Sequence, residues 1–394
     1  HAPLYIPRFS RPSSENGLTS NALADDVRPR EVFGWAMYDF ANSGYTTVVM
    51  TAVFNAYFVG VVAANASWAT LAWTSALALS SAVVMLTMPS LGALADLRAN
   101  KKRLLAFCTA GCGLFTALLA LAGPGDLWLA IGAIVLSNIF YSYGESLNAA
   151  FLPELARRNA LGRVSGWGWS FGYFGGMLTL GLSLGYVLWA QGQGMSAAQF
   201  VPVTMLITAG IYALASLLTF ALLKERAVPQ AAAQQQGGLR ASLQRLAQTW
   251  RQAQDYRDFV WLLVCAVAYQ SGIAVVIALA AVYAEQVLGF QQTQTMMLIF
   301  LVNIAAAVGA FAFGYWQDRI GHRVALAVTL VGWIVMTLLA YAATSAALFW
   351  VAAVVAGYHP DLSTRLLAGA HDRLMEAGLR EGQFEDHWVP GAFE

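Results

Sequence analysis

Five polar side chains lie within long apolar runs of the sequence, and their types suit the binding of a polar solute or a proton. They are Asp39, Asn42, Asn138, Glu145 and Gln270. The first two are three residues apart and the next two are seven apart, so each pair shares one face of a helix. Ionisable residues inside a membrane segment are costly and therefore usually face a cavity or a bundle interior.

Asp39 and Glu145 are expected to lie in the same layer of the membrane. Each lies seven or eight residues inside its run, which is roughly 10 to 12 Å at 1.5 Å per residue. No Lys or Arg falls within the apolar runs, and a carboxyl group without a cationic neighbour in a low-dielectric layer favours its neutral, protonated form. This pattern suits a proton-coupled carrier or a site for a substrate amine. The alternative is a structural hydrogen bond to a neighbouring helix.

The elements that position these residues are membrane-spanning helices. Hydrophobic residues make up 58% of the 394 residues and charged residues only 11%, which predicts an all-α integral membrane protein. Nine runs are long enough to span a bilayer, and a tenth is too short. The expected parts are a tail (1–31), a six-helix bundle (32–223), a central loop with an amphipathic helix (224–257), an incomplete second bundle (258–357) and a soluble segment (358–394).

The basic residues indicate the orientation of the helices. All 22 Lys and Arg residues fall on alternate loops or on the tails, so the positive-inside rule places both termini and the central loop in the cytoplasm. We expect a monomer in a bacterial inner membrane, with the lipid bilayer and a small solute as partners and no nucleic acid.

A short basic motif occurs twice, each time as a loop between two apolar runs. Its residues are Gly92, Asp96 and Arg98 in the first copy and Gly314, Asp318 and Arg319 in the second. The Gly and the Asp are shifted by the same number of positions, which indicates two related halves of one architecture.

Other motifs predict packing rather than chemistry. Gly168, Gly172 and Gly176 form a ridge of small residues that lets another helix approach closely, and the spacing does not fit a nucleotide-binding loop. Cys108 and Cys112 share a helix face, which could suggest a metal or redox pair, and they are interpreted as small packing residues. All five histidines lie outside the apolar runs, so we expect neither a metal nor a cofactor.

The repeated motif resembles the signature of the major facilitator superfamily. Within it, the segments 35–43, 148–155 and 165–176 resemble vacuolar amino-acid effluxers linked to autophagy and their bacterial relatives, over about residues 32–350. The resemblance implies two six-helix bundles, with helices 1, 4, 7 and 10 lining a central cavity. It places the five polar residues named first on cavity helices and the repeated motif in loops that latch the two halves together.

The end of the chain departs from that pattern. Helices 11 and 12 are absent and the tenth is short, while residues 351–394 resemble the opening of lumazine synthase, including Tyr358-His359 and the final stretch Val389–Glu394. A chimeric or truncated chain is therefore expected here.

The sequence favours a secondary active transporter of a small polar solute, such as an amino acid, working by alternating access with proton coupling. The alternative is a truncated or chimeric membrane protein that does not transport. A membrane enzyme is not favoured, because the sequence shows no group of residues that would supply a nucleophile or bind a metal or a cofactor.

Overall fold

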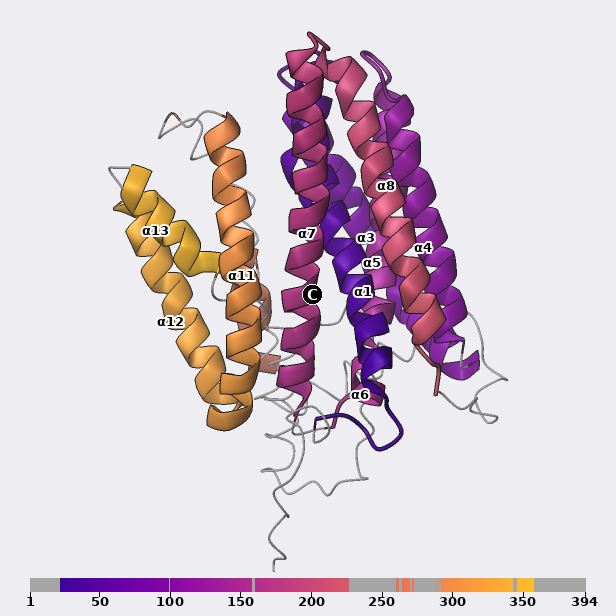
Figure 1. The fold of residues 1–394 in the computed structure, drawn as a ribbon, viewed down its shortest axis with the longest axis vertical. Coiled ribbons are helices and arrows are strands. Elements are labelled where there is room, and N and C mark those ends of the chain that lie inside the picture. Colours follow the sequence, from indigo (N-terminus) through magenta and orange to yellow (C-terminus); the bar gives the residue numbers. More distant parts are fainter. Residues whose placement is uncertain are drawn as a thin grey trace, which may run out of the picture.

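The computed structural model is helical throughout the part of the chain that it describes (Figure 1). These residues are 22–98, 100–157, 160–226, 292–342 and 346–357, together with 260–261, 264–269, 271–272 and 289. Within them there is no β-strand, and one isolated bridge joins Leu23 to Ala156. The expected amphipathic helix of the central loop lies outside the described residues, as does the soluble segment 358–394. Most of the seventh run around Gln270 also lies outside them.

The first part of the chain forms one bundle. Its helices are α1 (Pro29–Tyr45), the π-helix η1 (Thr46–Ala52), α2 (Phe54–Tyr57), the π-helix η2 (Phe58–Val62), α3 (Ala69–Arg98), α4 (Lys101–Leu118), the 3-10 helix η3 (Leu119–Leu121), α5 (Leu127–Ala149), α6 (Leu152–Leu155), α7 (Leu161–Gly192) and α8 (Ala197–Leu222). Helix α1 contacts α5, α7 and α8, so the helix that carries Asp39 is enclosed by its neighbours.

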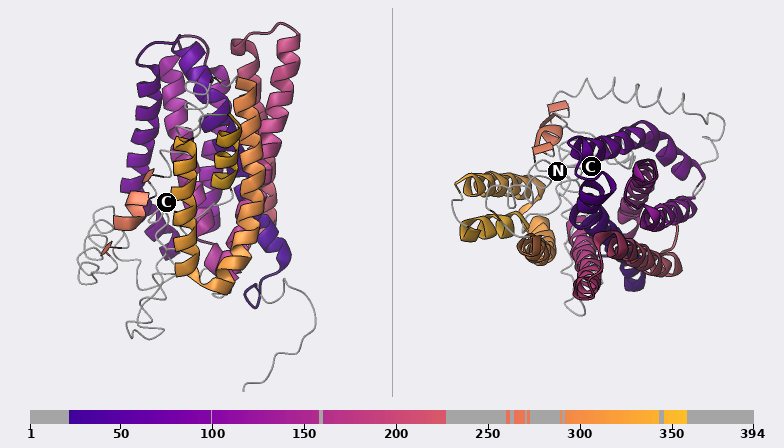
Figure 2. Two further views of the ribbon diagram at one scale, coloured as in Figure 1. Left: turned by 90° about the vertical axis from the view of Figure 1, so that its left-hand side faces the viewer. Right: turned by 90° about the horizontal axis from the view of Figure 1, so that it is seen from above.

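A second group of helices stands beside this bundle (Figure 2). It consists of α11 (Gln292–Ile320), α12 (His322–Tyr341) and α13 (Ala346–Gly357). Helix α13 packs against both α11 and α12, and α11 packs against α7 of the first bundle. At 12 residues, α13 is as short as the sequence predicts.

Eight helical segments among the described residues are long and apolar enough to cross a membrane. They are Pro29–Val62, Ala69–Gly92, Lys101–Leu121, Leu127–Leu155, Leu161–Gly192, Ala197–Leu222, Met297–Gln317 and Val324–Tyr341. Large apolar side chains point outward, as Met85 and Trp128 do with 70% and 88% of their surface exposed. Polar side chains such as Ser80, Thr179 and Thr204 are fully buried. Because this distribution is the reverse of that in a soluble protein, the chain is an integral membrane protein.

The predicted ridge of glycines on α7 packs against α1. A Cβ atom added at Gly172 would lie 2.9 Å from the Ser43 hydroxyl, and one at Gly176 would lie 2.9 Å from the Thr47 hydroxyl. Both positions therefore require glycine for the close approach of the two helices, and the packing interpretation is confirmed.

The repeated motif was expected to lie in loops, and this expectation is wrong. Gly92, Asp96 and Arg98 lie in the last turns of α3, and Gly314, Asp318 and Arg319 lie near the end of α11. Beyond the hydrocarbon layer a charged residue no longer costs membrane-insertion energy, so each helix continues past its apolar run. Helix α11 ends only at Gly321, whose φ of 82° suits glycine.

The first apolar run does not form one continuous α-helix, because its second half contains two π-helical segments, η1 and η2. The first begins at Thr46, whose hydroxyl donates to the carbonyl oxygens of Asn42 and Ser43. Such a hydroxyl competes for the helix's own backbone acceptors. The run therefore changes its winding directly after the residues that carry the candidate site.

Candidate functional site

Two carboxylates and two amides form hydrogen-bonded pairs across the contact between α1 and α5. The Asn148 amide nitrogen Nδ2 donates to Asp39 Oδ1 over 2.9 Å. The Asn42 amide nitrogen Nδ2 donates to Glu145 Oε2 over 3.4 Å. Asn42 lies three residues after Asp39 on α1, and its partner Glu145 lies three residues before Asn148 on α5. The two helices therefore run antiparallel here, and both hydrogen bonds fit one register between them. Each carboxylate thus receives an amide donor from the facing helix.

Trp35 and Gly168 enclose this group. The Trp35 indole nitrogen donates to the Asn148 carbonyl oxygen over 2.9 Å, which ties the last turn of α5 to α1. A Cβ atom at Gly168 on α7 would lie 2.5 Å from the Trp35 ring and 2.7 Å from Asp39 Oδ2. Since only glycine leaves that space open, α7 forms a close wall on the Asp39 side of the group.

The two amides are deeply buried. Asn42 is 3% exposed and Asn148 is 1% exposed, whereas Asp39 and Glu145 are only partly buried. The amide oxygens Oδ1 of Asn42 and Asn148 are buried without a hydrogen-bond partner. A buried acceptor without a donor costs free energy. The two carboxylates, which are more exposed than the amides, can take up a proton or accept hydrogen bonds from an ammonium group.

Asn138 does not join this group. Its amide nitrogen donates to the Ser80 hydroxyl on α3 over 2.5 Å, and the residue is 5% exposed. The Ser142 hydroxyl bonds within α5, to the Asn138 carbonyl oxygen at 2.9 Å. In the structure Asn138 links α5 to α3, while Glu145 on the same helix contacts α1.

The structure describes some of the remaining predicted site residues and not others. Gln270 lies outside the described residues, as do the side chains of Asp96, Arg98 and Asp318. Gly92 is buried and Arg319 is exposed.

Gly314 lies where α11 crosses α7. A Cβ atom at Gly314 would lie 2.7 Å from the Gly162 carbonyl oxygen, and one at Gly166 would lie 3.3 Å from the Gly314 Cα atom. The glycine of the second motif copy is thus required by the close approach of the two groups of helices.

An aromatic contact accompanies this crossing. The Trp167 indole nitrogen donates to the Tyr315 hydroxyl over 3.1 Å, and the Arg163 guanidinium lies 5.3 Å from the centre of the Tyr315 ring. A cation over an aromatic face at this distance is attractive. No sequence pattern marks these three residues as a group, although Trp167 directly precedes Gly168 of the predicted ridge.

Within the described part of the chain, the three cysteines form neither a disulfide nor part of a metal-binding group. Cys108 and Cys112 are buried and free, and each belongs to a hydrophobic core cluster, as their interpretation as packing residues predicts. Cys265 is free and exposed. The described residues contain no group of three or more His, Cys, Asp or Glu residues that could hold a metal ion.

Comparisons with known proteins place this arrangement among transporters. A family model described as "Vacuole effluxer Atg22 like" matches residues 55–361. A protein of Bacillus subtilis (strain 168), described as the uncharacterized MFS-type transporter YxiO, is 26% identical over 329 residues, which are 82% of this chain and 75% of that protein. The family match continues past residue 351, and these matches give no support to the lumazine synthase resemblance of the stretch that follows.

Solved structures share the fold. The proton:xylose symporter XylE has a TM-score of 0.61 at 12% identity, with 92% of this chain and 83% of that chain covered. The E. coli fucose:proton symporter FucP has a TM-score of 0.58 at 16% identity, with 92% and 85% covered. At these identities the similarity shows a shared fold.

Proposed function

Because this chain belongs to the Atg22-like family of vacuole effluxers, which are transporters of the major facilitator type and not enzymes, we propose that it carries amino acids across the membrane by alternating access. We propose further that transport of the solute is coupled to the movement of protons through Asp39 and Glu145. The fold and the family give a transporter in the bilayer acting on a small solute. The class of solute and the coupling are our proposals.

The pairing of the two carboxylates with Asn148 and Asn42 is the observation that carries this proposal. The carboxylates are only partly buried, so a solute or a proton can reach them. An amino acid offers an ammonium group that can donate to these carboxylates. A proton on either carboxyl group would occupy an oxygen that the ammonium group needs, so proton and amine binding compete for one set of oxygens.

The same proposal assigns supporting roles to the other predicted residues. Gln270 is proposed to line the solute pathway from the second bundle, and Asn138 to support α5 through α3. The two copies of the motif, Gly92 to Arg98 and Gly314 to Arg319, are proposed to latch the bundles 32–223 and 258–357 in one state of the cycle. The close contact at Gly314 supports such a latch.

The orientation follows from the distribution of basic residues. The end of the structure that carries the start of α1, the link from α3 to α4 and the end of α8 is here called the basic end. We propose that the basic end faces the cytoplasm of a bacterial cell, as the positive-inside rule requires.

Uptake into proteoliposomes tests the proposed function. Purified full-length protein is reconstituted, and the entry and exit of labelled amino acids are measured with and without an imposed pH gradient, against liposomes without protein. Accumulation of at least one amino acid that rises with the gradient supports the proposal. Transport of other polar solutes alone would contradict the amino-acid assignment, and no transport of any solute would favour a protein that does not transport.

A further inference from the structure

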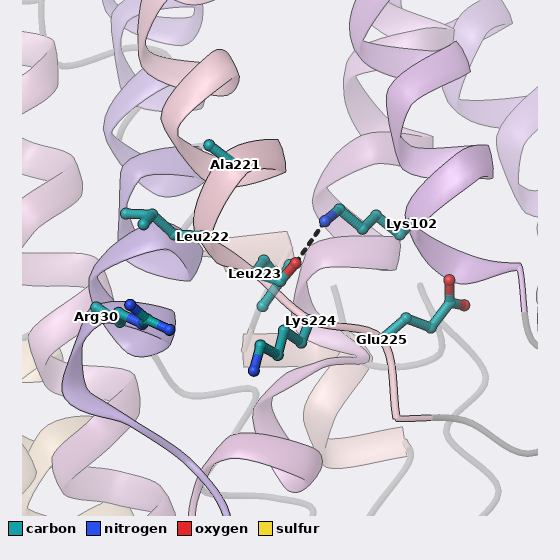
Figure 3. Close-up of a pocket in the computed structure, with 7 residues that line it drawn as sticks. All are labelled: Arg30, Lys102, Ala221, Leu222, Leu223, Lys224 and Glu225. Carbon is teal, nitrogen blue, oxygen red and sulfur yellow. Dashed lines mark hydrogen bonds between the residues drawn. The ribbon is translucent and has the colours of Figure 1, made fainter.

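The basic end of the first bundle contains a cavity of about 460 Å³, shown in Figure 3. It lies where the start of α1, the start of α4 and the end of α8 meet. Its lining residues are Arg30, Lys102, Ala221, Leu222, Leu223, Lys224 and Glu225. Three cations and one carboxylate therefore surround a space with an apolar wall, and the proposed transport site uses none of these residues.

The three cations are not neutralised by ion pairs among the described residues, and a hydrogen bond holds Lys102 in place. The Lys102 ammonium donates to the Leu223 carbonyl oxygen over 2.5 Å, and Arg30 and Lys224 are exposed. None of the three forms an ion pair within the described part of the chain. Figure 3 shows the Lys224 side chain extending toward Arg30, while the Glu225 side chain extends to the opposite side. The cavity thus presents a net positive charge.

The surrounding ion pairs involve other residues. Glu31, which is fully buried, accepts from Arg226 over 2.7 Å, and Lys101 pairs with Glu154 over 3.1 Å. These pairs fix the segment after α8 and the first turn of α4. They leave the cavity cations available for a ligand from outside.

The helix backbone adds to the positive potential. Helix α4 begins at Lys101 with three consecutive basic residues and no acidic residue in its first turn. The N-terminal end of a helix carries a partial positive charge, so basic residues there repel it unless an anion is near. An anion bound beside the start of α4 would therefore reduce this electrostatic repulsion.

The apolar wall leads from the cavity into the bilayer. Leu214, Leu217 and Leu218 of α8 are 67%, 63% and 44% exposed. Together with the exposed Ala221 in the cavity wall they repeat at intervals of three and four residues, so they form one face of the helix. This stripe offers a path for an acyl chain that ends at the three cations.

We infer that this cavity binds the phosphate of an acidic membrane lipid in the leaflet at the basic end. Inorganic phosphate offers the same charge but has no acyl chain to lie along the leucine stripe. Basic pockets between membrane helices suit anionic headgroups in this way. The inference does not depend on the transported solute.

Native mass spectrometry of the full chain in detergent tests the inference. The protein is titrated with phosphatidylglycerol, with phosphatidylcholine and with inorganic phosphate. We expect preferential retention of phosphatidylglycerol, and about a fivefold loss of its affinity in each of Lys102→Gln and Lys224→Gln, since a basic residue near an anionic headgroup contributes about that factor. Arg103→Gln, which removes an exposed cation of α4 outside the cavity, should leave the affinity unchanged.

Glu225→Gln supplies a test with the opposite sign. Removing the one carboxylate of the lining should raise the affinity for phosphatidylglycerol, a gain that a damaged fold would not produce. Equal retention of the two lipids, equal losses in the Arg103 variant, or binding of inorganic phosphate without a preference for the lipid would overturn the inference.

Discussion

The Asn148 side chain donates to the Asp39 carboxylate over 2.9 Å, and the Trp35 indole holds the Asn148 carbonyl oxygen at the same distance. Asn148 is therefore fixed by α1 through both its side chain and its backbone. Because Asn148 is almost completely buried, removing its amide would leave the Asp39 carboxylate with one donor fewer in a low-dielectric site.

The first prediction concerns Asn148. Asn148→Ala should lower the rate of solute uptake at least tenfold and destabilise the fold by about 1 to 3 kcal/mol, the usual cost of losing a buried hydrogen bond. Ser142→Ala should change both quantities little, because that hydroxyl bonds only within its own helix. Uptake in proteoliposomes and thermal unfolding in detergent measure the two effects. Normal uptake by Asn148→Ala would show that Asp39 does not need this donor.

The second prediction concerns the contact between α1 and α7. Gly168→Ala would place a methyl group 2.5 Å from the Trp35 ring, so it should destabilise the protein by about 1 to 3 kcal/mol, as overpacking does. Gly181→Ala, on the same helix with open space around it, should be neutral or slightly stabilising. The two melting temperatures are compared in one detergent, and equal values would contradict the packing described for Gly168.

The third prediction concerns the crossing of α7 and α11. Gly314→Ala would place a methyl group 2.7 Å from the Gly162 carbonyl oxygen. Because the close contact is with backbone, the two helices would have to move apart, and the variant should be destabilised by about 1 to 3 kcal/mol, as overpacking does.

Gly185→Ala is the control for this substitution. It lies on α7 with open space around it, so it should leave the stability unchanged or raise it slightly. Thermal unfolding of both variants in one detergent measures the difference. Equal melting temperatures would contradict the close contact described at Gly314.

Much of the fold follows from the sequence because the bilayer limits the alternatives. Apolar runs of spanning length and a strict alternation of basic loops predict the helices, and the structure confirms the eight that lie within its described residues. Helix ends were harder to predict. Arg98 and Arg319 belong to helices because charged residues extend a helix readily once it leaves the hydrocarbon.

The site was predicted in part. Asp39, Asn42 and Glu145 were identified because polar residues in an apolar run are conspicuous. The carboxylate partner Asn148 was seen only as part of a resembling segment, since its role depends on the register between α1 and α5. Asn138 has the same spacing signal as Glu145, yet it contacts α3. The rotation of α5 decides between these contacts, and the sequence pattern does not give that rotation.

Solute exchange and gradient-driven accumulation, measured together for Asp39→Asn, test the central claim most directly. Asp26→Asn is the matched control, because Asp26 is exposed at the basic end and lies outside the site. We predict that Asp39→Asn loses accumulation driven by a pH gradient while retaining some exchange of solute, and that Asp26→Asn behaves as the unaltered protein. Accumulation by Asp39→Asn at the normal rate and with the normal dependence on the gradient would contradict the account.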